Sequence, residues 1–169
     1  FKDSKTPGVY KIGAWVHSGR FEHKRWGTDG LSLADPASNG QAARHRGNYG
    51  VYAIADQVVL PASQDSMGQV SVFARAFYNP RQDRGLLSWQ ADGGVVVKGV
   101  FGRPNDAWGV AASYMKVGKA AIAYDRDFAT FNPGAPVRNY EAVIEANYLF
   151  ELRRDHRARP LPHLLLGTP

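Results

Sequence analysis

The 169-residue chain contains no cysteine, which excludes disulfide bonds and cysteine-ligated metal sites. It has no run approaching the roughly 18 consecutive apolar residues of a membrane-spanning helix, and this excludes the helical class of membrane protein. The first seven residues, FKDSKTP, lack the apolar segment of a secretory signal peptide. We therefore expect a single domain that begins as a mature, processed or partial chain.

Clustered charge and catalytic motifs are scarce as well. The net charge is +6, but residues 153–169 supply about half of it, because this segment contains four arginines and one aspartate. The other basic residues are scattered singly, which argues against a nucleic-acid partner. The chain has no Gly-x-Ser-x-Gly, His-Glu-x-x-His or glycine-rich phosphate loop, so we predict no enzymatic activity and no cofactor.

What the chain has in abundance is glycine, with 18 residues, and strand-like alternation. In NYEAVIEANYLFEL (139–152), the even positions from 140 to 150 are apolar, and the odd positions from 139 to 147 are polar with one exception. At the period of a helix, apolar and polar residues would not separate onto two faces as well. Similar patterns predict strands at 8–18, 49–60, 69–78, 88–101 and 107–116. Strands of about ten to fourteen residues are long for a soluble sheet.

The predicted connections alternate between long and short. Residues 19–48, 79–87 and 118–138 would lie at one rim, and the shorter segments 61–68 and 102–106 at the other. This asymmetry is typical of outer-membrane barrels. Trp89 and Phe101 bracket one strand over roughly 40 Å, which projects to ~28 Å at a tilt of about 45°, close to the height of a barrel's apolar band. The pattern predicts an all-β, antiparallel up-and-down transmembrane β-barrel. The alternative is a soluble sugar-binding β-sheet module of lectin-like or lipocalin-like type.

Strand parity sorts the side chains into a water-facing set and a lipid-facing set. Charges of both signs on the water-facing side suit a neutral polar solute better than a phosphate. Glu141 and Glu145 lie roughly 13 Å apart along a strand, beyond the ~5–9.5 Å of glycosidase pairs, so a hydrolase is disfavoured. The pore-lining candidates are Lys11, Trp15, His17, Phe73, Arg75, Asp92, Lys98, Glu141, Glu145 and Asn147. The aromatic candidates for the lipid interface are Tyr10, Trp89, Phe101, Trp108, Tyr114, Tyr140, Tyr148 and Phe150.

The sequence predicts no metal site. His17, His23 and His45 are not at a recognised ligand spacing. Asp125 and Asp127 are not followed by the twelve-residue acidic loop of a calcium site, so we expect them to form ion pairs in a loop. The long segments 19–48 and 118–138 are candidates to fold inward and constrict or cap a pore.

Four segments, taken together, resemble the carbohydrate-selective outer-membrane porins of Gram-negative bacteria, the porin B family. They are GVYKIGAWVHSGRF (8–21), GNYGVYAIADQ (47–57), VFARAF (72–77) and NYEAVIEANY (139–148). The resemblance implies a sixteen-stranded, homotrimeric barrel in the outer membrane, in contact with its lipid, through which glucose-like sugars diffuse passively.

About six strands correspond to part of that barrel. We therefore expect a partial porin domain at 1–152. At 153–169 we expect an atypical tail that is truncated or frame-shifted, because its alternation stops and it contains prolines. On its own, such a chain is expected to form an open sheet that aggregates and does not conduct.

Overall fold

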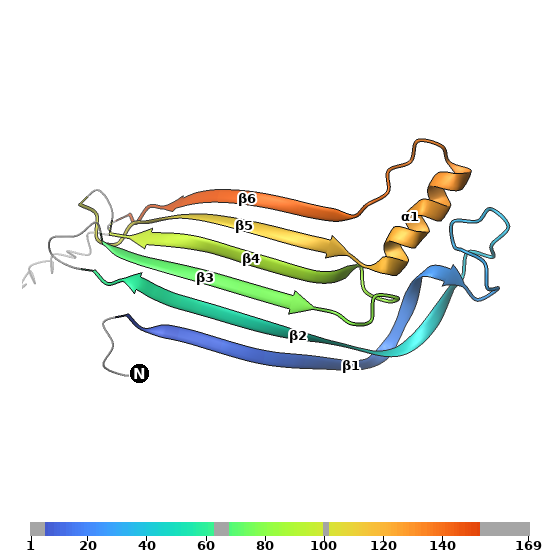
Figure 1. Cartoon of the computed structure of the whole chain (residues 1–169), viewed down its shortest axis with the longest axis horizontal. Helices are drawn as coiled ribbons and strands as arrows, with labels where there is room; N and C mark the ends of the chain where they lie inside the picture. The colour runs from blue at the N-terminus through green and yellow to red at the C-terminus, as the bar shows by residue number, and fades with distance from the viewer. Residues whose placement is uncertain (1–5, 63–67, 100–101, 153–169) are drawn as a thin grey trace, which may run out of the picture.

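The computed structural model describes residues 6–62, 68–99 and 102–152. It contains six β-strands and one α-helix (Figure 1). The predicted tail at 153–169 and the interface candidate Phe101 lie outside the described residues. The strands are β1 (Gly8–Gly27), β2 (Ala42–Leu60), β3 (Gln69–Tyr78), β4 (Leu87–Lys98), β5 (Ala107–Val117) and β6 (Tyr140–Leu149), and the helix is α1 (Lys119–Phe131).

The strands form one sheet in which spatial order follows chain order, from β1 to β6. Every neighbouring pair is antiparallel. This confirms the predicted all-β, up-and-down meander. The sheet is open in the described residues, with β1 at one edge and β6 at the other (Figure 1).

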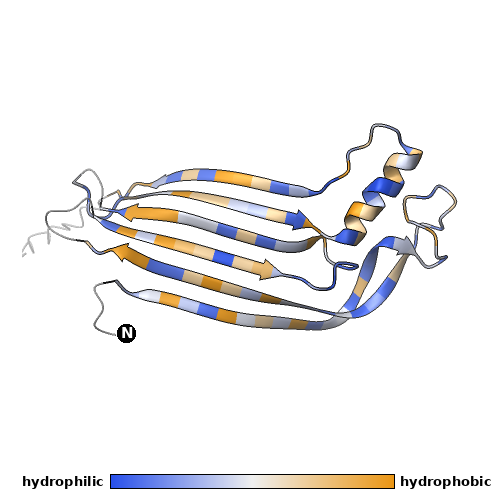
Figure 2. Cartoon of the chain, in the orientation of Figure 1, coloured by the Kyte–Doolittle hydropathy of each residue, from blue (hydrophilic) through white to orange (hydrophobic). Residues whose placement is uncertain are grey.

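Alternating hydropathy explains why these segments are strands. Bands of apolar and polar residues follow one another along the arrows in Figure 2. In β6, for example, Tyr140, Ala142 and Ile144 alternate with Glu141 and Val143. Because successive side chains of a strand point to opposite faces, this pattern gives the sheet one apolar face and one mainly polar face.

The first two strands are longer than predicted. Residues 19–27 and 42–48, expected within a long connection, extend β1 and β2, so only 28–41 lie between the strands. The register between β1 and β2 shifts after His17 and again after Glu22. These bulges insert unpaired residues and reverse the parity of the side chains, so a search for strict alternation ends at the first one.

The second long connection contains α1, which the sequence reading left without regular structure. Its composition, KAAIAYDRDFATF, is rich in alanine, which favours a helix. Asn132 closes the helix, and Pro133 and Gly134 follow, with Gly134 at φ +91°. Among the described residues, no helix has both the length and the apolar character needed to cross a membrane.

Candidate functional site: the polar face and the mouth

The strand register decides which side chains share a face, because directly paired residues project to the same side of a sheet. One such row runs Lys11, Ile54, Arg75, Asp92, Ser113 and Val143. The adjacent row runs Tyr10, Ala55, Ala74, Gly93, Ala112 and Ile144. We call the first side the polar face and the second the apolar face.

All ten residues predicted to line a pore lie on the polar face in this register. Six of the eight aromatic candidates lie on the apolar face, namely Tyr10, Trp89, Trp108, Tyr114, Tyr140 and Tyr148. Phe150 follows the end of β6, where the Arg103 guanidinium lies 4.1 Å from its ring centroid. The contact of these aromatics with lipid and the lining role of the polar face remain predictions.

The apolar face is not covered by other parts of the described chain. Ile12 is 91% exposed and Ile144 is 80% exposed. The buried apolar residues of the described chain are Ala34, Val97, Val117 and Ala121, too few to form a core against that face. A soluble sheet of this size would bury such residues, so the apolar face is suited to an apolar solvent.

At the centre of the polar face, Asp92 collects hydrogen bonds from two strands. Gln90 Nε2 donates to Asp92 Oδ1 at 2.9 Å, and the Ser113 hydroxyl donates to the same oxygen. Arg75 is paired with Asp92 in the register, and its guanidinium lies 4.9 Å from the Phe73 ring centroid. The face therefore presents a carboxylate, a guanidinium and an aromatic ring side by side.

Aromatic rings on the β1–β3 half of the polar face lie over glycines. A Cβ atom added to Gly13 would come within 2.3 Å of the Tyr52 ring, and one added to Gly50 within 2.7 Å of the Trp15 ring. Trp15 and Phe77 stack with their centroids 6.4 Å apart and an interplanar angle of 5°. The absence of a side chain at these glycines lets the rings lie close to the backbone.

The β4–β6 half of the polar face carries amides and carboxylates instead. Glu145 accepts a hydrogen bond from Asn147 at 3.3 Å, and Glu141 lies on the same face of β6. Four polar-face residues are not among the predicted lining residues, although the predicted alternation already places the last three on that face: Tyr52, Phe77, Gln90 and Ser113.

The mouth is the end of the sheet formed by 28–41, 79–86 and 118–139, where α1 lies (Figure 1). Two bidentate ion pairs fix α1. Arg25 of β1 donates to both carboxylate oxygens of Asp127 at 2.7 and 3.0 Å, and Arg138 donates to both oxygens of Asp125 at 2.8 and 2.7 Å. The expected ion pairs are thus confirmed, although both aspartates lie on a helix. Because α1 follows β5 and contacts β1, it connects strands that lie four positions apart in the sheet.

The arginines shift the ionisation of these aspartates. Hydrogen bonds from Arg138 lower the pKa of Asp125, and those from Arg25 lower the pKa of Asp127. Both carboxylates therefore stay ionised under acidic conditions in which an unpaired aspartate would begin to bind a proton.

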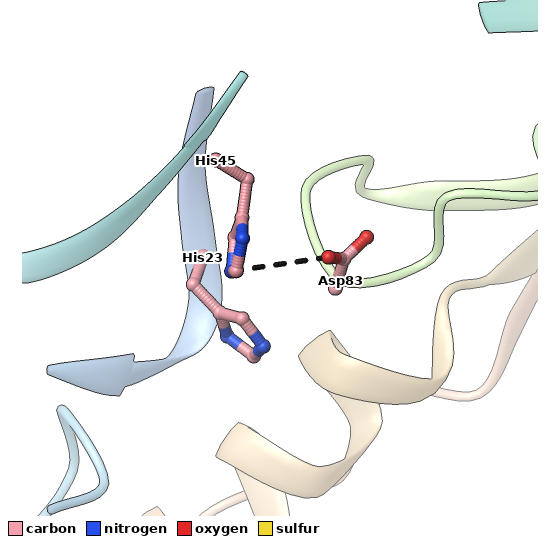
Figure 3. Close-up of side chains that lie close together, drawn as sticks. All are labelled: His23, His45 and Asp83. Carbon is pink, nitrogen blue, oxygen red and sulfur yellow. Dashed lines mark ion pairs between the residues drawn. The ribbon is translucent and has the colours of Figure 1, made fainter. Parts of the chain in front are cut away.

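The mouth also brings together His23, His45 and Asp83, which the sequence did not indicate as a set (Figure 3). The three ligand-type atoms lie within 4.8 Å of one another. His45 Nε2 is buried, has no hydrogen-bond partner in the described residues, and lies 3.9 Å from Asp83 Oδ2. The convergence depends on the β3–β4 connection and on the bulged ends of β1 and β2, so spacing along the chain could not reveal it.

Hydrogen bonding in this cluster does not suit a metal ion. His23 Nδ1 accepts the backbone N–H groups of Arg25 and Trp26, each at 3.0 Å, so the proton of the neutral ring lies on Nε2 and blocks that atom as a ligand. Arg84 donates to both oxygens of Asp83 at 3.1 and 2.7 Å. Hydrogen bonds from Arg84 lower the pKa of Asp83. The residues present fit a structural contact better than a cation site.

At the opposite end of the sheet, Asp106 joins β6 to the β4–β5 turn. Its side chain is buried and accepts hydrogen bonds from Arg103 Nε at 2.5 Å, Tyr148 Oη at 2.6 Å and the Glu151 backbone N–H at 3.1 Å. The Arg103 hydrogen bond is the main cause that lowers the pKa of Asp106 to about 2.

A long-stranded antiparallel meander with one uncovered apolar face and one polar face is the construction of a porin wall. Residues 1–160 match the family described as carbohydrate-selective porin, OprB family. The chain therefore belongs to the carbohydrate-selective porin family OprB.

A solved structure has a similar fold. The structure titled "High pH structure of Pseudomonas putida OprB" superposes with a TM-score of 0.73 at 20% sequence identity, covering 85% of this chain and 36% of that one. At this identity the likeness establishes the fold alone, and the chain spans about a third of the length of that protein. The search of curated proteins found no match.

Proposed function

We propose that the six strands form part of the wall of an outer-membrane porin through which neutral sugars diffuse passively. The observation that carries the proposal is the register, which gathers all ten predicted lining residues on one face and leaves the opposite face apolar and uncovered. Membership of the carbohydrate-selective porin family supports sugars as the solutes. The polar face would line the water-filled pore, and the apolar face would contact lipid.

The composition of the polar face suits sugars. A pyranose ring has an apolar side that can stack on aromatic faces, such as Trp15 and Phe73, and hydroxyl groups that need hydrogen-bond partners, such as Asp92 and Asn147. Arg75 and Lys11 offset Glu141 and Glu145 in charge, so neither sign dominates the lining. This chemistry fits diffusion of a neutral solute without a catalytic step, and we propose a channel rather than an enzyme.

The two edges of the sheet require further strands. In a bilayer, each unpaired backbone group at the edges of β1 and β6 would cost roughly several kcal/mol, because no water is present to form a hydrogen bond with it. We therefore propose that these six strands act within a closed barrel, the complete porin, and that the sheet alone does not conduct. The homotrimer implied by the resemblance is part of this proposal, and sedimentation of the complete porin in detergent would measure it.

A liposome experiment with the complete porin tests the proposal. Proteoliposomes should swell in isotonic glucose. The variant Arg75→Ala should change the swelling rate and shift ion selectivity towards cations, because a positive charge leaves the lining. Ala74→Val, on the adjacent position of the apolar face, is the matched control and should leave both unchanged. A complete porin that passes ions but no sugar would overturn the carbohydrate function, and an effect of Ala74→Val equal to that of Arg75→Ala would overturn the assignment of the faces.

A further inference from the structure

The apolar face carries a charge at one point. The strand registers define which described residues lie on this face. Among those strand positions, Lys116 is the one that carries a charge. It occupies the next-to-last position of β5, at the mouth end, and is paired with Trp89 of β4 and Tyr140 of β6. A cation on a face that contacts lipid is costly unless its ammonium group reaches the polar headgroups.

Aromatic residues flank Lys116 in the sheet. The Tyr114 ring stacks on Trp89 with centroids 5.0 Å apart and on Tyr140 with centroids 5.3 Å apart, so three rings form a continuous platform. Tyr140 is 60% exposed, which leaves this platform open to the membrane. Stacked tyrosine and tryptophan rings are typical of the boundary between hydrocarbon and headgroups. The Lys116 side chain therefore starts at the depth where headgroup phosphates begin.

A second cation lies on the same side of the sheet. The Arg81 guanidinium is 5.7 Å from the ring centroid of Tyr49, which the register places on the apolar face through its pairing with Val16. Arg81 is exposed and belongs to the β3–β4 connection at the mouth. Neither Lys116 nor Arg81 forms an ion pair with a carboxylate of the described residues, whereas Arg25, Arg84 and Arg138 all do. Lys116 Nζ donates to the neutral Asn139 side chain.

Among the described residues, the strand positions at the opposite end of the apolar face include aromatic residues and no such cation. Tyr10 donates its hydroxyl hydrogen to the Gln57 amide oxygen, and Trp108 pairs with Tyr148. The one carboxylate fixed beside Tyr148, that of Asp106, is neutralised by Arg103. Within the described part of the chain, the two ends of the face thus both carry aromatic residues and differ in charge, and the cations at the mouth favour an anionic partner there.

We propose that Lys116, Arg81 and the aromatic platform bind the phosphate groups of membrane lipids in the leaflet that surrounds the mouth. The inference rests on the proposed function, because it takes the apolar face to contact lipid. The ammonium and guanidinium groups would each contact a phosphate, while Trp89, Tyr114 and Tyr140 pack against the upper part of the acyl chains and the sugar backbone of a phosphorylated glycolipid.

Lipid retention by the complete porin tests this site. The porin, purified in a mild detergent, would be titrated with diphosphoryl lipid A or with the monophosphoryl form and examined by native mass spectrometry. We expect the diphosphoryl lipid to bind more tightly, and each neutralised cation to weaken its binding about fivefold, so that Lys116→Gln with Arg81→Gln weakens it about 25-fold. Lys116→Arg with Arg81→Lys should retain the binding.

Two matched controls complete the design. Lys11→Gln with Lys98→Gln removes the same charge from the polar face and should leave lipid binding unchanged. Equal binding of both lipids, or equal losses in the two double variants, would overturn the proposal. Glucose-driven swelling of liposomes containing Lys116→Gln with Arg81→Gln should match that of the unaltered porin. A porin that binds the diphosphoryl lipid but passes no sugar would contradict the proposed function and leave the lipid site standing.

Discussion

The wall and the mouth of this sheet are built in different ways. In the wall, meaning the paired lengths of the six strands between the two rims, each residue's environment follows from its parity, and neighbours alternate between the polar and apolar faces. In the mouth, residues far apart in the chain meet at single contacts, such as Arg25 with Asp127 and His45 with Asp83. The wall is therefore governed by a repeated rule, and the mouth by individual pairs that the rule does not specify.

The largest expected effect comes from breaking the parity rule of the wall. Ile144 lies on the apolar face midway along β6 between Tyr140 and Tyr148, and its chain neighbour Val143 lies on the polar face. Ile144→Lys should destabilise the complete porin in a bilayer by about 2–4 kcal/mol, because a charge near the midplane faces hydrocarbon. Val143→Lys should cost much less. Reversible urea unfolding in lipid vesicles measures the two free energies of unfolding, and equal losses would show that the faces do not differ in solvent.

A smaller effect is expected from breaking one pair of the mouth. Asp127→Asn removes the bidentate contact with Arg25. The Arg25 side chain is 30% exposed and the Asp127 side chain is 22% exposed. We expect a local loss of about 1 kcal/mol in the stability of α1, moderated by that exposure. Hydrogen exchange of the α1 amides would measure it. Glu22→Gln, which breaks the exposed ion pair with Arg44, is the control and should leave these amides unchanged. Protection of α1 that is the same in both variants would show that the Arg25 contact does not hold the helix.

The smallest effect concerns the Asp106 carboxylate, at the end of the sheet opposite the mouth, and it depends on pH. The folded state lowers the pKa of Asp106 to about 2, below the ordinary 3.8 of an aspartate. Its contribution to stability is therefore complete above about pH 4 and is lost as the pH falls towards 2, since the carboxylate then takes up a proton. Exchange protection of the last residues of β6 should fall in this interval. Asp106→Asn should show low exchange protection of these residues at every pH. If protection in the unaltered protein instead falls near pH 6, a group other than Asp106 controls it.

This difference explains how much of the molecule could be predicted from sequence. The strand at 69–78 was predicted with its observed bounds, since Val70, Val72 and Ala74 alternate with Ser71 and Phe73 without interruption. β1 was predicted to end at Ser18, because the bulge there reverses the parity that the prediction used. Nothing local marks where the alternation resumes.

The mouth contacts were beyond such reasoning for a related cause. His23 and His45 lie on two strands, and Asp83 on a connection, so their meeting depends on the lengths of β1 and β2 past the bulges. The alanine-rich run at 119–123 could have predicted the helix α1. No local pattern indicates that α1 contacts Arg25. Local propensity predicts that an element exists, and the register of distant strands decides what it touches.

In the proposed pore, the glycines beneath the polar-face rings would influence the diameter of the channel. At Gly13, an added Cβ atom would come within 2.3 Å of the Tyr52 ring, and at Gly50 the same atom would meet both Trp15 and Phe77. Exchanging either glycine for alanine would tilt a ring away from the backbone and into the lumen, while every strand kept its length and pairing. The bore could thus be narrowed by one methyl group at a time, which makes these glycines a means of adjusting the largest solute admitted without rebuilding the wall.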